Sequence, residues 1–157
     1  MSHSPASVSA KRRRSAFTLV EILIVVVIMA VLAATIIPSF SNSVADAKVN
    51  TAVFNLNTLR SQIEHYRAEH DGKVPAVVAG KLPELTGKTD KAGTVGPGGS
   101  YGPYLRDLPE NTIKSVNTIK TITNDPPVAG DAVGTEGWLY NATTGGVWIN
   151  DATHYVE

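Results

Sequence analysis

Residues 17–37, which read FTLVEILIVVVIMAVLAATII, decide the fold of this 157-residue chain. No charged residue lies between Glu21 and Asp46, and residues 22–37 are apolar except for Thr35. A helix over residues 22–45 would be about 36 Å long, enough to cross a bilayer core of about 30 Å. A helix buried in a soluble core would show a polar face, which residues 22–34 lack. The stretch therefore predicts a membrane-spanning helix.

The charges around this stretch predict its orientation. Residues 1–16 carry four basic side chains at positions 11–14 and no acid, whereas the rest of the chain carries 10 basic and 14 acidic residues, a net charge of −4. Because basic residues flank the cytoplasmic end of a membrane helix, residues 1–16 are expected in the cytoplasm and the rest across the membrane. A formal net charge of zero and the absence of cysteine give no basis for nucleic-acid binding, disulfides or cysteine-based metal or redox sites.

Two other N-terminal signals are alternatives. A secretory signal peptide has a shorter apolar region, of about 7 to 15 residues, although Ala33 and Ala34 could mimic its cleavage site. A simple signal anchor would have the right length. Both leave Glu21 unexplained, because a carboxylate at the edge of a bilayer core is costly without a cationic partner.

The order of these features resembles the signal of type IV prepilins, found in type IV pilins and in the pseudopilins of type II secretion. A basic leader, a small residue, Phe17-Thr-Leu-Val-Glu21 and a long apolar run follow one another. The resemblance implies cleavage between Ala16 and Phe17 by a membrane-embedded prepilin peptidase, N-methylation of Phe17, and an assembly role for Glu21 beside a neighbouring subunit's terminal amine. Pro38 falls where the family has a helix-kinking proline; the alternative is that the membrane helix ends there. The family usually has glycine before the cut, where this chain has Ala16.

A second amphipathic helical stretch follows the apolar one. Its apolar residues recur at steps of three and four and trace one face: Val49, Val53, Leu56, Leu59, Ile63 and Tyr66. Asp71-Gly72 is the expected stop. Together the two stretches predict one helix of roughly 50 residues, about 80 Å long.

The remaining residues predict a small head of α+β class. Residues 72–109 are rich in glycine and proline and predict ordered loop, with a short helix at 82–85. Residues 112–123 predict a strand, and residues 137–141 and 146–150 predict a hairpin around a four-residue loop. Three antiparallel strands are expected to cover the second half of the helix, with Leu139, Val147, Ile149 and one of the two tryptophans facing it. The domains are thus a leader (1–16), a membrane and filament-core helix (17–45) and a pilin-like head (46–157).

No residue constellation indicates an enzyme. Gly98-Gly-Ser-Tyr-Gly102 matches a serine-hydrolase motif, but that motif needs a preceding strand and a following helix, and proline flanks this one. His65 and His70 are five residues apart, so they do not form an i,i+4 metal pair; they are expected to be solvated or packed in the head.

Calcium is the one cofactor that the resemblance suggests, because major pseudopilins typically hold one Ca²⁺ in a loop near the C-terminus. Carboxylates in the corresponding half are Asp125, Asp131, Glu136 and Asp151. No spacing among them resembles a dense Asp/Gly calcium loop, and the alternative is that they form turns and solubilise the surface. The expectation is therefore no cofactor, with calcium as the weaker alternative.

The sequence predicts a structural subunit rather than an enzyme. The resemblance implies a type II secretion pseudopilin of the major type, anchored in the inner membrane with a periplasmic head. It implies polymerisation with copies of itself and other pseudopilins on an inner-membrane assembly platform. A type IV pilin forming a surface fibre and a membrane-anchored or secreted binding domain are the alternatives.

Overall fold

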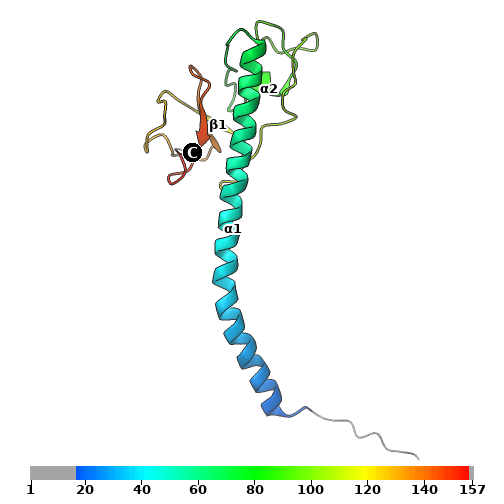
Figure 1. The fold of residues 1–157 in the computed structure, drawn as a ribbon, viewed down its shortest axis with the longest axis vertical. Coiled ribbons are helices and arrows are strands. Elements are labelled where there is room, and N and C mark those ends of the chain that lie inside the picture. The colour runs from blue at the N-terminus through cyan, green and yellow to red at the C-terminus, as the bar shows by residue number, and fades with distance from the viewer. Residues whose placement is uncertain (1–16, 156–157) are drawn as a thin grey trace, which may run out of the picture. The chain divides into compact units, whose positions relative to one another are not determined.

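The computed structural model describes residues 17–155, except the side chains at positions 38 and 39. One long helix and a small sheet dominate it (Figure 1). The elements are α1 (Leu19–Glu69), α2 (Pro83–Thr86), β1 (Ile119–Ile122), β2 (Trp138–Asn141) and β3 (Val147–Ile149). The chain divides into two compact units, Met1–Ser41 and Asn42–Glu157, and we call the described part of the second unit the head.

Helix α1 ends where the sequence predicts. Its 51 residues stop at Glu69, and Asp71 and Gly72 both adopt positive φ angles, 54° and 82°. The Gly72 amide donates to the Arg67 carbonyl at 2.9 Å, which satisfies one of the last helical carbonyls. Glycine takes this left-handed conformation without steric cost. The prediction of one helix of about 50 residues is confirmed.

The sheet is mixed, and the prediction of an entirely antiparallel sheet is wrong. Strands β2 and β3 form the predicted antiparallel hairpin, with Trp138 opposite Ile149 and Tyr140 opposite Val147. Strand β1 pairs with β2 in parallel, with Ile119 opposite Trp138. Residues 123–137 connect β1 to β2, and a connection of about this length lets the chain cross over and run in the same direction. The strand predicted over 112–123 is limited to Ile119–Ile122.

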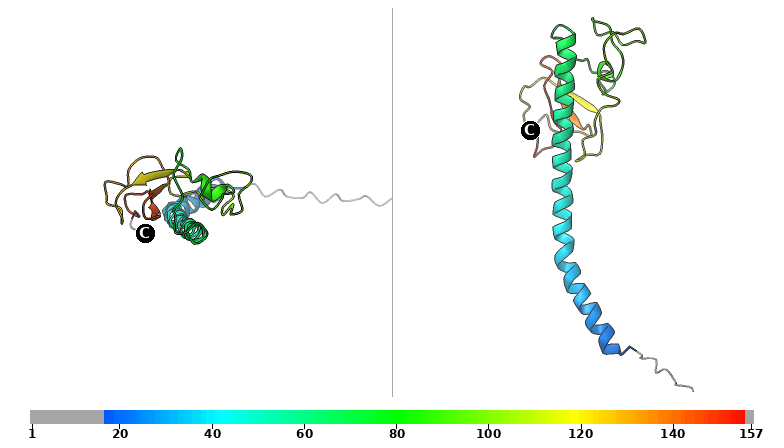
Figure 2. Two further views of the ribbon diagram at one scale, coloured as in Figure 1. Left: turned by 90° about the horizontal axis from the view of Figure 1, so that it is seen from above. Right: turned by 45° about the vertical axis from the view of Figure 1, so that its right-hand side comes forward.

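The head core lies between α1 and one face of the sheet. Figure 2 shows the sheet beside the second half of α1. The core takes the predicted apolar face of α1 and the side chains on the helix-facing side of each strand. These residues include Leu56, Leu59, Ile63, Tyr66, Ile119, Trp138, Tyr140, Val147 and Ile149, each less than 5% exposed. The tryptophan against the helix is Trp138, whose indole N–H donates to the Pro109 carbonyl at 2.8 Å.

Leu139 does not face the helix, contrary to the prediction. Alternation along β2 places it on the opposite face, where it packs with Ile122, Ala132 and Trp148 in a second, smaller cluster. This cluster gives the sheet two covered faces. Because both faces are buried, every residue of β2 and β3 is buried and the alternation of polar and apolar residues that would separate the faces is missing.

The glycine- and proline-rich residues 72–109 form ordered loop around the C-terminal end of α1, with α2 one residue from its predicted position. Leu82 and Leu85 from this region are fully buried in the head core. The loop is also held by side chains from α1. The Tyr66 hydroxyl donates to the Glu84 carboxylate at 2.6 Å, and the Tyr104 hydroxyl donates to that of Glu69 at 2.5 Å.

Candidate site of processing, anchoring and assembly

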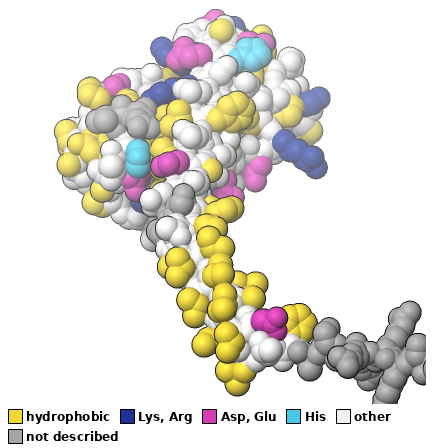
Figure 3. All heavy atoms as spheres, turned by 60° about the horizontal axis from the view of Figure 1, so that its bottom comes forward, with side chains coloured by type: hydrophobic (Ala, Val, Ile, Leu, Met, Phe, Trp, Pro, Cys, Tyr) yellow, Lys and Arg dark blue, Asp and Glu magenta, His cyan; other side chains and the backbone are white. Residues whose placement is uncertain are grey.

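Residues 17–37 form an entirely exposed apolar surface, which we call the apolar segment. Every residue in it is exposed, and its large side chains are 47% to 82% accessible. An 18-residue window of α1 reaches a mean hydropathy of 3.0, and none of that window is buried. Hydrophobic side chains cover this part of the helix (Figure 3). A core helix of a soluble protein would bury such a surface, but nothing in the described chain covers this one. By length and composition α1 could cross a membrane.

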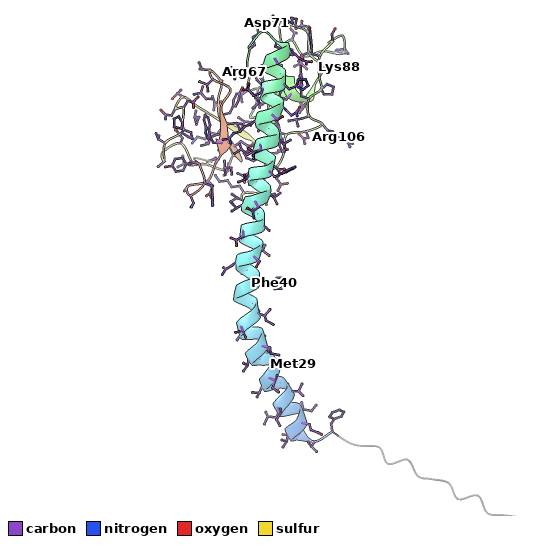
Figure 4. All side chains as sticks on the ribbon, in the orientation of Figure 1. Met29, Phe40, Arg67, Asp71, Lys88 and Arg106 are labelled. Atoms are coloured by element: carbon purple, nitrogen blue, oxygen red, sulfur yellow. The ribbon has the colours of Figure 1, made fainter. Side chains whose placement is uncertain are left out.

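The polar groups inside the apolar segment are satisfied locally. Thr35 is the single polar residue between Ile22 and Ile37, and its hydroxyl donates to the carbonyl of Val31 at 2.8 Å. Hydrocarbon offers no hydrogen-bond partners, so a hydroxyl bonded within its own helix suits a bilayer or a helical bundle. Met29 and Phe40 extend away from the helix axis (Figure 4).

Glu21 closes a capping box at the start of α1. Its carboxylate Oε2 accepts hydrogen bonds from the Thr18 amide at 2.8 Å and the Thr18 hydroxyl at 3.0 Å. The Thr18 hydroxyl in turn accepts from the Glu21 amide at 3.2 Å. Thr18 is the N-cap and Glu21 the third helical residue, so each satisfies an amide that the helix leaves without a partner. A carboxylate in the first turn also suits the positive end of the helix dipole.

This capping box was missed in the sequence, although the motif Thr18-x-x-Glu21 before an apolar run is its recognised signature. The resemblance implies that Glu21 meets the terminal amine of a neighbouring subunit's Phe17, and this pairing stays a prediction. In the single chain Glu21 is held by Thr18. The carboxylate therefore has a partner within its own chain.

The predicted cleavage site lies at the boundary of the described residues. Ala16 lies outside them. Phe17 lies within them, 82% exposed and two residues before the first helical residue. Its backbone is thus not part of the α-helix.

Helix α1 continues through position 38. The alternative that the helix ends at Pro38 is therefore wrong. The kink stays a prediction, because the Pro38 side chain is outside the described residues.

The four calcium candidates do not converge. Asp131 Oδ2 accepts from the Val128 amide at 2.9 Å and the Asn124 side-chain amide at 2.8 Å, and the first of these contacts is the largest cause lowering the pKa of Asp131. Asp151 pairs with His154 at 2.8 Å. Within residues 17–155 no three histidine, aspartate or glutamate side chains form a group able to hold a metal ion. The carboxylates present do not fit a calcium site, which needs about six to eight oxygen ligands.

Asp125 and Glu136 lie in different settings. Asp125 is exposed and lines a shallow hollow beside Arg60 and Glu64 of α1. The Glu136 carboxylate lies close to Gly134, within its own loop.

The other candidate side chains have structural places. Residues 98–102 form a loop without a following helix, which does not meet the requirement of the serine-hydrolase motif. His65 is exposed, whereas His70 is fully buried. The two ring nitrogens of His70 lie 2.9 Å from the Tyr66 carbonyl and 3.0 Å from the Thr89 hydroxyl, and its ring stacks on Tyr66. His70 therefore joins the loop to the end of α1 and is packed in the head, one of the two places expected for it.

Comparisons with known proteins agree with this arrangement. The family model described as "Prokaryotic N-terminal methylation motif" matches residues 11–37. Three relatives are each named "Type II secretion system core protein G". The protein of Aeromonas hydrophila is 30% identical over 103 residues, which cover 64% of this chain and 68% of the relative.

The other two matches are shorter. The relative from Pseudomonas aeruginosa is 33% identical over 60 residues, and the one from Dickeya chrysanthemi is 35% identical over 60 residues. These matches cover 38% of this chain and about two fifths of each relative, 42% and 39%. No solved structure gives a significant match.

The chain has a methylation motif at the start of a long helix, and the second half of this helix packs on a small sheet. These features define a pilin-like subunit. Within that class the chain belongs to the family of type II secretion system core protein G, the pseudopilins.

Proposed function

We propose that this chain is the structural subunit of a periplasmic pseudopilus, anchored in the inner membrane until it is assembled. The observation that carries the proposal is the contrast within α1. Its first half exposes every side chain of an apolar surface, whereas its second half buries one face in the head. A surface of this size is stable only in lipid or against other helices of the same kind.

In this proposal the leader is removed between Ala16 and Phe17 and the new amine of Phe17 is methylated. The methylation motif that covers residues 11–37 supports this step. Because Phe17 precedes the helix and is exposed, a membrane peptidase reaches it without unfolding α1. Cleavage leaves the capping box intact, because Thr18 and Glu21 both stay in the mature chain.

Orientation and partners follow from charge and family. The basic residues 11–14 keep the N-terminus in the cytoplasm, so the head lies in the periplasm. Partners are copies of this chain, other pseudopilins, the prepilin peptidase and the inner-membrane assembly platform, with no role for nucleic acid. The names of the three relatives support membership of a type II secretion system.

Glu21 would have two successive partners. In the free subunit Thr18 satisfies its carboxylate, so the subunit is stored in the membrane without an unpaired charge. In the filament the terminal amine of a neighbouring Phe17 becomes a stronger, charged partner in a water-free core. A subunit out of register would leave that charge unpaired, so the pair sets register.

Replacing Glu21 tests this proposal in cells that carry the secretion system and its peptidase. We expect Glu21→Gln to reach the membrane and lose its leader as the wild type does, but to be absent from sheared or sedimented filaments. The control is Glu64→Gln, a mostly exposed glutamate on the same helix, which should assemble normally. Assembly of Glu21→Gln at the wild-type level would overturn the role given to Glu21. Absence of both variants from filaments would show a general effect of removing acidic residues and would also contradict a specific role for Glu21.

Orientation is tested separately. The chain has no cysteine, so a single introduced cysteine reports its own location. We expect Ser100→Cys, at an exposed position of the head, to react with a membrane-impermeant maleimide once the outer membrane is opened. Labelling only after lysis of the inner membrane would contradict a periplasmic head.

A further inference from the structure

The connection between β1 and β2, residues 123–137, turns its carbonyl oxygens toward nitrogen donors of the chain itself. The Lys120 ammonium donates to the carbonyls of Asp131 at 2.8 Å and Val133 at 3.0 Å. The Lys114 ammonium donates to the carbonyl of Gly134 at 2.9 Å. Two positive charges therefore hold three carbonyls within residues 131–134.

Two buried amides complete the set of donors. The Asn150 side chain donates to the carbonyls of Val133 at 3.4 Å and Glu136 at 2.7 Å. The Asn141 side chain donates to the carbonyls of Thr123 at 3.1 Å and Asn124 at 3.3 Å. Both asparagines belong to the sheet or its edge and are at most 3% exposed. The start and the end of the connection are thus fixed to the sheet by uncharged donors, and its middle by lysines.

Strand geometry explains why Lys120 can reach the carbonyls of the connection. It stands opposite Leu139, which in turn stands opposite Trp148, and this row lies on the sheet face turned away from α1. Residues two apart share a face of a strand, so Lys120 shares this face with Ile122. A lysine can lay its methylene stem along an apolar surface while its ammonium reaches polar groups beyond. The connection covers the same face, and its carbonyls meet the ammonium there.

We propose that the Lys120 ammonium supplies the positive charge that holds the carbonyls of this connection, and that the head therefore folds without calcium. The carbonyl oxygens of this connection that could ligate a divalent ion already accept hydrogen bonds from the two lysines and Asn150. Like charges would also repel a divalent ion from the Lys120 ammonium. The Asp131 carboxylate, whose own main-chain carbonyl binds Lys120, already accepts hydrogen bonds from Val128 and Asn124. The inference concerns the folding of the head and is independent of how the subunit assembles.

Calcium dependence is the first test, on the full chain purified in detergent. Both tryptophans lie in the sheet, so their fluorescence follows melting of the head alone. Melting is compared in EGTA and in about 5 mM CaCl₂, a concentration above the dissociation constant of about 1 mM found for the weakest extracellular calcium modules. A bound ion at that concentration would raise the midpoint by about 4 °C. We expect midpoints within 1 °C of each other, and a rise of 3 °C or more would overturn the proposal.

Substitution of the lysine is the second test. We expect Lys120→Met to lower the midpoint by at least about 4 °C, because it leaves two carbonyls without their charged donor. Lys120→Arg keeps the charge and should lose less. The matched control is Lys88→Met, at an exposed lysine whose ammonium makes no hydrogen bond within the described chain (Figure 4). The role of Lys120 would be overturned if Lys120→Met and Lys88→Met had the same melting midpoint. It would also be overturned if Lys120→Met and Lys120→Arg lowered the midpoint equally. Should Lys120→Met fail to fold, the Arg variant and the calcium comparison decide.

Discussion

Replacing Leu59 by alanine tests whether the second half of α1 is part of the head core. Leu59 is fully buried between α1 and the sheet. Alanine is the better helix former, so the substitution does not weaken the helix itself. Truncating a buried leucine costs about 2 to 5 kcal/mol through lost apolar contact and the cavity left behind. For a domain the size of this head, that loss lowers the melting midpoint by about 8 to 20 °C.

The matched control is Phe54→Ala, five residues earlier on the same helix. Phe54 is larger than leucine but 70% exposed, so its removal should cost less than about 0.5 kcal/mol and shift the midpoint by no more than about 2 °C. Tryptophan fluorescence of the full chain in detergent follows the head, because α1 contains no tryptophan. A wild-type midpoint for Leu59→Ala would refute the packing of α1 in the core. A large loss for Phe54→Ala would show that the buried face has been misassigned.

Two further predictions concern the loop around the end of α1. Burial is the largest cause raising the pKa of Tyr66, Tyr104 and Tyr140 far above the usual value. Above about pH 10 the unfolded chain loses phenolic protons that the folded head keeps, so stability is fully present below pH 10 and falls as pH rises further. Urea unfolding should show that the free energy of unfolding declines as pH rises. Tyr66→Phe should make this decline shallower and should cost about 1 kcal/mol at pH 7 through the lost hydrogen bond. An equally steep decline in the variant would contradict this cause. Gly99→Ala should destabilise the head, because a Cβ there would lie 2.5 Å from the main chain at position 89, whereas Gly98→Ala meets nothing within 4 Å and should melt as the wild type does; equal midpoints would show that the close approach is absent.

Local signals in the sequence predicted most of the fold. The steps of three and four from Val49 to Tyr66 gave the buried face of α1, and Asp71-Gly72 gave its end. The four-residue loop ending in Gly145 gave the hairpin and its antiparallel pairing. Each of these depends on residues close together in the chain, where backbone conformation and side-chain spacing suffice.

Contacts between distant segments were not predictable in the same way. Nothing in residues 123–137 specifies that the chain crosses over and makes β1 parallel to β2. The same connection buries the outer face of the sheet, so Leu139 could be assigned to either face from its sequence context. The sequence is equally compatible with a solvated and a buried His70, because its partners Tyr66 and Thr89 meet it only once the loop has folded back.

The candidate site was only partly predictable. The apolar segment and Glu21 stood out from composition and from the order of features in residues 11–37. The capping bond between Thr18 and Glu21 follows from the free amides of the first helical turn, whereas the charge of Glu21 alone suggests only a cationic partner. The candidate calcium carboxylates were chosen by position in the chain, whereas a metal site requires convergence in space.

The intact mass and N-terminal residue of the protein recovered from membranes test the central claim most directly. We expect loss of residues 1–16 and a single methyl group on the amine of Phe17. An uncut chain would contradict prepilin processing and leave a simple membrane anchor. A new terminus near Ala33 or Ala34 would remove most of the apolar segment and contradict the proposed subunit of a filament.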